Sequence, residues 1–204
     1  MVDRNNDLAE IAAEVDVGYL GIVTPDGYPR VVPVNFATIR EHVYFHGAAS
    51  GEKHDAMLGG GKVTFCIAVP YAMIPSYWRS EQYACPATQY FKSVLIKGRA
   101  VVVDDPTEKA RALQALMDKH QPEGGFQPFD YTSQLYRGPI DKVGIFRIDP
   151  DQVDIRLKFG QNLSEPTRKV IIDRLLERGG DLDVRTVEEM RRVSAMSSEE
   201  GDTK

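Results

Sequence analysis

The sequence is poor in cysteine and has no long hydrophobic run. Two of its 204 residues are cysteines, Cys66 and Cys85, and they form no CxxC pair. A cysteine content this low is usual in a reducing compartment and gives no basis for a disulfide framework. No apolar run approaches the roughly 20 residues of a membrane-spanning helix, and the polar, acidic N-terminus lacks the pattern of a secretion signal. We therefore expect a cytoplasmic protein that does not enter a membrane.

The sequence also has no excess of basic residues. The formal net charge is -5 and the pI is near 5.4, whereas proteins that bind nucleic acid broadly have a basic face. The four histidines show neither HxxxH nor HExxH spacing, so the sequence predicts no metal site. No GxSxG motif occurs, and Cys66 lies in an apolar run rather than in the electropositive setting of a nucleophile. Nucleic-acid binding, zinc catalysis and covalent hydrolysis are disfavoured, and a local anion site stays open.

The remaining pattern is that of a mainly β protein with flanking helices. Six segments have the composition or alternation of strands; they span residues 19–24, 30–38, 43–46, 62–69, 90–103 and 143–155. Helices are predicted over residues 7–15, 51–58, 106–117, 164–178 and 187–192. Residues 71–89 and 121–138 are predicted to be loops. Because strands and helices do not alternate regularly, the pattern argues against a doubly wound parallel sheet.

Local signals predict where several of these elements begin and end. Pro33 marks an edge strand, a bulge or a barrel rim, because proline cannot donate to a central ladder. The predicted helix caps are Asn6, Ser50, Asp105 followed by Pro106, and the capping box Thr186 to Glu189, and Gly179-Gly180 ends the preceding helix. We predict a barrel domain over residues 1–157, a helical extension over 158–193 and a disordered tail over 194–204.

Five polar residues in the first third of the chain suggest an anion site. They are Arg30, Asn35, His46, Ser50 and Lys53. Arg30 supplies a planar fork of donors, while Ser50 and Lys53 flank a predicted helix start, whose dipole also attracts negative charge. A phosphate group suits that combination. The alternative is that Arg30 and Lys53 are solvated charges at a strand edge and on a helix surface.

These residues belong to a longer pattern. It comprises Gly18-Tyr19-Leu20-Gly21-Ile22-Val23, Asp26-Gly27-Tyr28-Pro29, Val32-Pro33-Val34-Asn35, Tyr44-Phe45-His46-Gly47-Ala48, Gly51-Glu52-Lys53, Tyr90-Phe91-Lys92-Ser93-Val94, Gly98-Arg99-Ala100 and Glu108-Lys109 through Ala112-Leu113. In this pattern the chain resembles the FMN-binding split β-barrel family that includes pyridoxamine 5'-phosphate oxidase, and within it the nitroimidazole-reductase-like (Nim) proteins. The resemblance covers roughly residues 15–150. It implies a six-stranded antiparallel split β-barrel.

The resemblance also implies a cofactor and its ligands. In that family FMN lies at the interface of a homodimer. Together with Ser50, the positions that match the family give the cofactor-binding set Arg30, Val31, Val32, Pro33, Val34, Asn35, Phe45, His46, Ser50, Lys53 and Ser93. Lys53 matches a phosphate ligand, and Phe45 and His46 match the strand-end pair near the phosphate and ribityl chain. Where the oxidase has a basic residue just before the matched lysine, this chain has Glu52.

A second, weaker resemblance concerns the C-terminal part. Residues 158–171 look like the ending of PaiB-like flavin-binding regulators. Gln161 and Asn162 either reach across the dimer to the flavin or form a polar turn at the entry to a helix.

Two functions follow from the resemblances. One is an FMN-dependent oxidoreductase that passes electrons from NAD(P)H to a small acceptor, either nitroreductase-like or pyridoxamine-phosphate-oxidase-like. The other is a flavin-binding or regulatory protein without turnover. Haem is an alternative cofactor, with His46 as an axial ligand; the alternative for His46 itself is a hydrogen bond to backbone at a strand end. No residue is singled out as a catalytic acid or base.

Overall fold

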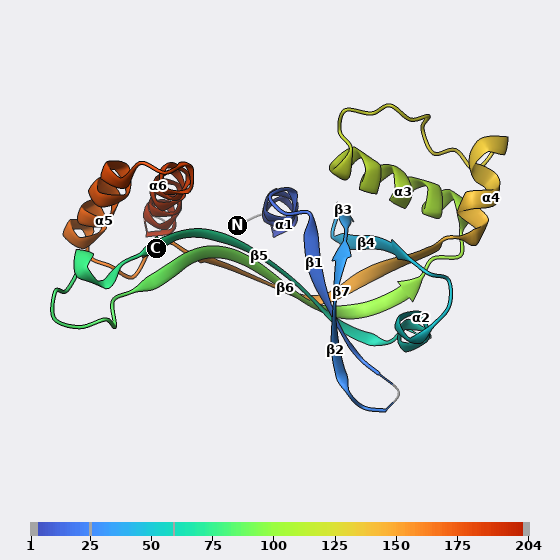
Figure 1. Ribbon diagram of the computed structural model, residues 1–204, viewed down its shortest axis with the longest axis horizontal. Coiled ribbons are helices and arrows are strands. Elements are labelled where there is room, and N and C mark those ends of the chain that lie inside the picture. Colours follow the sequence, from blue (N-terminus) through green and yellow to red (C-terminus); the bar gives the residue numbers. More distant parts are fainter. Residues whose placement is uncertain (1–3, 25, 59, 202–204) are drawn as a thin grey trace. The chain divides into compact units, whose positions relative to one another are not determined.

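A computed structural model describes residues 4–24, 26–58 and 60–201 of the chain, and it is built around one sheet of seven strands (Figure 1). The strands are β1 (Val17–Val23), β2 (Pro29–Asn35), β3 (Ala37–Ile39), β4 (His42–Gly47), β5 (Lys62–Ile74), β6 (Thr88–Val102) and β7 (Gly144–Lys158). Their order in the sheet is β2-β1-β5-β6-β7-β4-β3. The pairs β1–β2, β1–β5, β3–β4 and β4–β7 are antiparallel. The mainly β, antiparallel split-barrel prediction is confirmed.

The strand count differs from the prediction by one. The segment predicted as a single strand over residues 30–38 is two strands, β2 and β3, which separate at Phe36. Phe36 is fully buried and packs edge-on against Phe65, with ring centroids 5.1 Å apart. The chain therefore turns where a large side chain enters the core. β2, which carries Pro33, is an edge strand as expected, and it also contacts β4.

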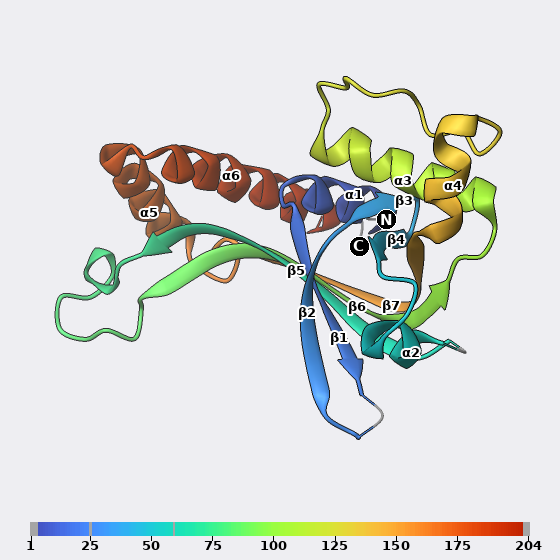
Figure 2. The same cartoon turned by 45° about the vertical axis from the view of Figure 1, so that its right-hand side comes forward.

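Helices account for most of the remaining chain (Figure 2). They are α1 (Arg4–Ala13), α2 (Glu52–Met57), the 3-10 helix η1 (Ser76–Trp78), α3 (Pro106–His120), α4 (Gln134–Lys142), α5 (Glu165–Arg178) and α6 (Asp181–Gly201). Within the part of the chain that the structure describes, no helix is both long enough and apolar enough to cross a membrane.

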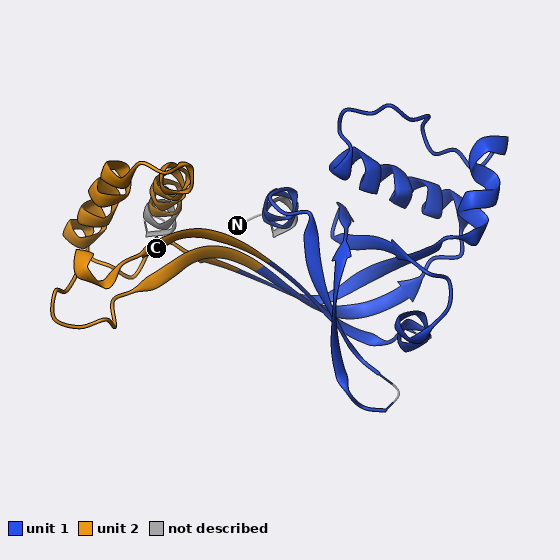
Figure 3. Cartoon of the chain, in the orientation of Figure 1, with its two compact units in different colours: residues 1–67, 94–155 blue, residues 68–93, 156–204 orange. Residues whose placement is uncertain are grey.

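The chain divides into two compact units (Figure 3). Unit 1 comprises residues 1–67 and 94–155, and unit 2 comprises residues 68–93 and 156–204. The division falls within the three long strands β5, β6 and β7. These units group residues differently from the domain boundaries predicted at 157 and 193, and those boundaries stay predictions.

In unit 1, α3 packs on β3 and β4. Asp105 caps α3 as predicted, because its carboxylate accepts hydrogen bonds from the backbone N–H groups of Thr107 and Glu108 at 3.3 and 3.0 Å. The Glu108 carboxylate accepts from the Tyr44 hydroxyl at 2.8 Å and from Arg147 at 2.7 Å. These bonds tie the first turn of α3 to β4 and β7.

In unit 2, α5 and α6 pack on each other, and Arg168 holds the pair together. Its buried guanidinium donates to the carbonyl oxygens of Phe159 at 3.1 Å and Met190 at 2.6 Å. The buried Lys92 ammonium lies 2.7 Å from the Glu189 carboxylate of α6. The guanidinium of Arg178 lies 4.9 Å from the ring centroid of Trp78 in η1. Two buried cations, Lys92 and Arg168, and the exposed Arg178 thus connect elements within this unit.

Several local predictions were wrong. α1 begins at Arg4, so Asn6 lies inside the helix rather than at its cap. Residues 71–89 contain the end of β5 and the short helix η1, and residues 121–138 contain the start of α4. Thr186 does not begin a helix; its hydroxyl donates to the Leu182 carbonyl at 2.6 Å and accepts from the backbone N–H of Ala72. α6 runs on to Gly201, so the expected tail is helical up to that residue, and 202–204 lie outside the described residues.

Candidate functional site

The two cations of the predicted anion site lie close together in unit 1. Arg30 is near the start of β2, and Lys53 lies in the first turn of α2. In the β1–β2 register Arg30 is opposite Ile22, so its side chain emerges on the same face as the buried residues of β1. That face also meets α2, which contacts β1. The sheet therefore directs Arg30 toward α2.

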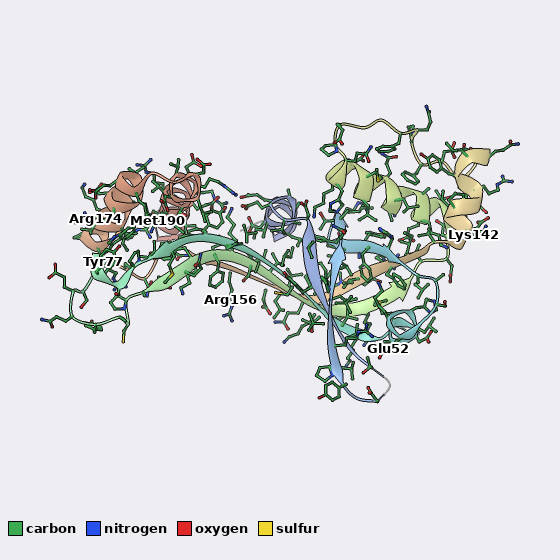
Figure 4. The ribbon with its side chains drawn as sticks, in the orientation of Figure 1. Glu52, Tyr77, Lys142, Arg156, Arg174 and Met190 are labelled. Atoms are coloured by element: carbon green, nitrogen blue, oxygen red, sulfur yellow. The ribbon has the colours of Figure 1, made fainter. Side chains whose placement is uncertain are left out.

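Arg30 is paired with a carboxylate. Its guanidinium forms an ion pair with Glu52, the residue marked on α2 in Figure 4. Both side chains are about half exposed, at 50% and 49%. An exposed pair of this kind contributes only about 0 to 1 kcal/mol to stability. Glu52, the residue in which this chain departs from the family pattern, thus neutralises part of the predicted site, but through a contact that a stronger anion can displace.

Lys53 is placed differently. Its ammonium group lies over the rings of Phe45 and Phe146, 5.7 and 5.8 Å from their centroids, and no carboxylate of the described residues is paired with it. Gly47 makes room for it, since a Cβ there would lie 2.7 Å from Lys53 Nζ. Burial and, second, the positive charge of Arg30 lower the pKa of Lys53. The site therefore holds a half-buried cation that lacks a counter-ion among the described residues.

The start of α2 contributes less to the predicted anion site than the sequence suggested. The helix has six residues, and its N-cap is Gly51 at φ 104°, with no side-chain hydrogen bond. Ser50 is exposed and does not cap the helix, so that prediction was wrong. Because Gly51 alone accepts the required backbone geometry here, the cap position falls one residue after the serine. We therefore base no anion site on this helix end.

A groove lies on the outer face of the same strands. The registers place Val31, Gly21 and Thr64 side by side across β2, β1 and β5. Gly21 has no side chain, and above it lies a cavity of about 600 Å³. The cavity is lined among others by Arg30, Val31, Lys62, Lys97 and Asp151. Its lining thus includes three cationic residues and one acid, and the Arg30 side chain leaves the sheet on the opposite face, toward α2.

Lys62 and Lys97 were not predicted as site residues. The signal was present in the alternation of β5, in which Val63, Phe65 and Ile67 are buried and the residues between them are not. Lys62 and Thr64 therefore share the outer face. Reading that alternation together with the β1–β5 register would have placed Lys62 beside the groove.

The other predicted residues are distributed between core and surface. Val32 is partly buried and Val34 is buried, while Pro33 and Asn35 are exposed. The Asn35 amide donates to the Asp16 carbonyl at 3.2 Å. Phe45 is fully buried and meets the site only through the Lys53 contact.

His46 is exposed at the end of β4. Ser93 is the last β6 residue of unit 2, and Gln161 belongs to the same unit. The Gln161 side chain accepts from the Phe159 N–H at 2.8 Å and donates to the Leu157 carbonyl at 2.5 Å, which fits the polar-turn interpretation. Among the described residues no cluster of three potential metal ligands occurs.

The structure is similar to several solved proteins. A candidate 5-nitroimidazole antibiotic resistance protein from Bacteroides thetaiotaomicron aligns with a TM-score of 0.59 and 21% identity, covering 74% of this chain and 82% of that chain. The flavocytochrome Anf3 from Azotobacter vinelandii aligns with 0.62 and 17%, covering 80% and 72%. An FAD and haem binding protein from Mycobacterium smegmatis aligns with 0.62 and 16%, covering 86% and 78%. At these identities the likeness establishes the fold.

The family is established by sequence. The family model described as pyridoxamine 5'-phosphate oxidase matches residues 4–157, about three quarters of the chain. The chain therefore belongs to the pyridoxamine 5'-phosphate oxidase family, which confirms the predicted resemblance, and the nitroimidazole branch is represented among the structural matches. No curated protein matches the chain.

The position of Lys53 predicts how it titrates. In Arg30→Gln the pKa of Lys53 should rise but stay below its ordinary value, because the nearby charge is removed and the burial remains. A lysine whose pKa is lower in the folded protein than in the unfolded chain binds its proton more weakly when folded. Between these two pKa values, its contribution to the free energy of unfolding therefore rises with pH. NMR titration of labelled lysines, assigned with Lys53→Arg, measures the shift. Arg99→Gln is the matched control on β6, and an unchanged Lys53 titration in Arg30→Gln would contradict the geometry.

Proposed function

We propose that this protein binds FMN and acts as an oxidoreductase that passes electrons from NAD(P)H to a small acceptor. The observation that carries the proposal is the Lys53 ammonium, half buried and without a carboxylate partner among the described residues. A half-buried cation without a counter-ion is unfavourable, and a phosphate would provide one. Arg30, whose charge acts on Lys53, also lines the groove over Gly21. Phosphate contact and groove are therefore adjacent.

The residues present fit the phosphate end of such a cofactor. Lys53 supplies a point charge and Arg30 a fork that can hold two oxygens at once. A dianionic phosphate competes with Glu52 for Arg30, and the exposed Arg30–Glu52 pair offers little resistance. His46, at the end of the neighbouring strand β4, is accessible for a further contact. We therefore propose Lys53 as the centre of the predicted anion site.

The bound flavin would supply the transfer of electrons and hydride. The chain would orient it and shape its surroundings. The open strip over Gly21, bordered by Val31 and Thr64, offers a flat apolar surface. Lys62 and Lys97 bring positive charge to its edge, which would stabilise negative charge on a group bound there. No side chain needs to act as acid or base in this scheme.

We further propose that a second copy of the chain covers the hairpin formed by β1 and β2. On its outer face, Tyr19, Val23 and Val31 are exposed by 48, 62 and 66%. The outer positions of the two strands are opposite each other in the register, so these side chains form one continuous apolar strip. Contiguous exposed apolar surface of this kind is typical of an interface. A homodimer would bury it and would place the flavin at the subunit boundary.

Variants of α2 should change FMN affinity in opposite directions. Lys53→Ala should weaken binding by about 1 to 3 kcal/mol because a charge-assisted contact is lost. Glu52→Gln should strengthen it several-fold, roughly the worth of one exposed pair, because Arg30 is freed. Asp55→Asn removes the same charge from α2 without touching Arg30 and should leave affinity nearly unchanged. Fluorescence titration of FMN measures all three, and equal affinities for Lys53→Ala and the unsubstituted protein would refute the site.

Electron transfer is tested on the FMN-loaded protein. Anaerobic mixing with NADH or NADPH should bleach the absorption band of oxidised flavin, because the reductant delivers its electrons to the ring. A band that persists with both reductants would show the alternative function, flavin binding without turnover. The visible spectrum of freshly purified protein settles the cofactor: a Soret band in place of flavin bands would assign haem.

A charged substitution in the apolar strip of the β1–β2 hairpin tests the proposed dimer. Val31→Glu should shift the protein from dimer to monomer in sedimentation velocity, since a buried unpaired carboxylate is unfavourable at an interface. The same variant should bind FMN more weakly if the cofactor lies at the subunit boundary. Val170→Glu, at an exposed valine of α5, is the matched control. A monomeric unsubstituted protein, or a Val31→Glu protein that stays dimeric, would refute the interface.

A further inference from the structure

Unit 2 contains a cavity of its own. It has a volume of about 370 Å³ and is formed by the end of β5, the loop that joins η1 to β6, the end of β7 and α5. Ile74, Leu163 and Ile171 give it an apolar wall. Arg79, Thr88 and Lys158 line it on the polar side, and no carboxylate does. The cavity therefore joins an apolar wall to a net positive lining.

A buried hydroxyl without a partner faces this cavity. Tyr90 lines it and is 2% exposed, and its hydroxyl oxygen has no hydrogen-bond partner among the described residues. A buried hydroxyl left unsatisfied is unfavourable by about 1 to 3 kcal/mol. The residue is held in place by Phe159, whose ring centroid lies 5.9 Å from that of Tyr90. The Tyr90 hydroxyl is thus a hydrogen-bond donor with no acceptor among the described residues.

The backbone beside this hydroxyl is adapted to it. Gly160 has φ +73°, a conformation that side chains rarely adopt, and a Cβ there would lie 2.4 Å from the Tyr90 oxygen. Glycine therefore leaves the space around the hydroxyl open. Gly160 follows Phe159 directly, so the residue that fixes the ring and the residue that frees the hydroxyl are neighbours in the chain.

The two cations of the cavity are available to a ligand. Arg79 is exposed and forms no ion pair within the part of the chain that the structure describes. The Lys158 ammonium lies over the Phe91 ring, 5.6 Å from its centroid, which positions the charge without neutralising it. Burial raises the pKa of Tyr90, and the charges of Arg168 and Arg79 act against that rise. The hydroxyl therefore keeps its proton at neutral pH and can donate it.

We propose that this cavity binds a small organic anion, a carboxylate or a phosphate ester carried on a compact apolar body. The Tyr90 hydroxyl donates a hydrogen bond to the anionic oxygen, and Arg79 and Lys158 balance its charge. Ile171 and Leu163 contact the apolar part. Every group in this site belongs to unit 2, so the site is distinct from the groups around Lys53. Oxyanions suit this site because its lining offers neutral donors and two cations and contains no carboxylate.

Calorimetric titration of the full-length protein tests the proposal with benzoate, phenyl phosphate and uncharged benzamide. Benzoate or phenyl phosphate should bind, and the tighter of the two assigns carboxylate or phosphate ester as the ligand class. Benzamide, of nearly the same shape, should bind at least tenfold more weakly. If neither anion binds, or if benzamide binds as tightly as benzoate, the proposal is overturned.

Substitutions of the lining residues test whether the anion binds in this cavity. Tyr90→Phe should weaken anion binding about fivefold and Arg79→Gln about tenfold, while the controls Tyr83→Phe and Arg174→Gln should bind as the unsubstituted protein does. Tyr83 is an exposed tyrosine of the same loop, and Arg174 is marked on α5 in Figure 4. Tyr90→Phe should melt no lower than the parent, because it removes an unsatisfied hydroxyl. Anion binding unaffected by Tyr90→Phe and Arg79→Gln, or abolished by Lys53→Ala, would place the ligand elsewhere and refute the site.

Discussion

The contact between Gly18 and Phe65 sets the register on which unit 1 depends. A Cβ at Gly18 would lie 2.1 Å from the Phe65 ring, so only glycine admits the aromatic side chain to the core there. Because side chains alternate along a strand, this contact also decides that Tyr19 and Gly21 face outward. A slip of one residue would bury the apolar strip of the hairpin and fill the groove. The core contact and the candidate cofactor surface thus lie on opposite faces of the same strand, β1.

The two cations of the predicted anion site differ in their electrostatic surroundings. Arg30 is exposed and already has an opposite charge in Glu52, whereas Lys53 is half buried over aromatic rings and has none among the described residues. The same positive charge thus has a different setting at each of the two positions. In the proposed function, a phosphate would gain most from Lys53, and Glu52 would moderate how strongly Arg30 adds to its binding.

Signals confined to a few neighbouring residues were predicted well. The Asp105 cap and the left-handed Gly179 that ends α5 both depend on local backbone geometry. Thr186 was misjudged because its hydroxyl bonds to Ala72, more than a hundred residues away in the chain. α4 was missed because Gly138 and Pro139 weaken its helical pattern.

For the site, the sequence identified which residues are cations but not which of them are already paired. Charge type is visible in a sequence, whereas the Arg30–Glu52 pair and the isolation of Lys53 depend on how β2 and α2 meet. Lys62 and Lys97 line the groove only because β1, β5 and β6 are neighbours in the sheet. The family resemblance implied Lys53 as a phosphate ligand, and the structure adds that its ammonium lies over two aromatic rings with no counter-ion among the described residues.

The chain has one tryptophan, and its setting gives the molecule an internal optical label. Trp78 lies in η1 beneath the Arg178 guanidinium, inside unit 2. Its emission therefore reports on the surroundings of η1, and a single emitting tryptophan makes any change in that emission assignable to this one position.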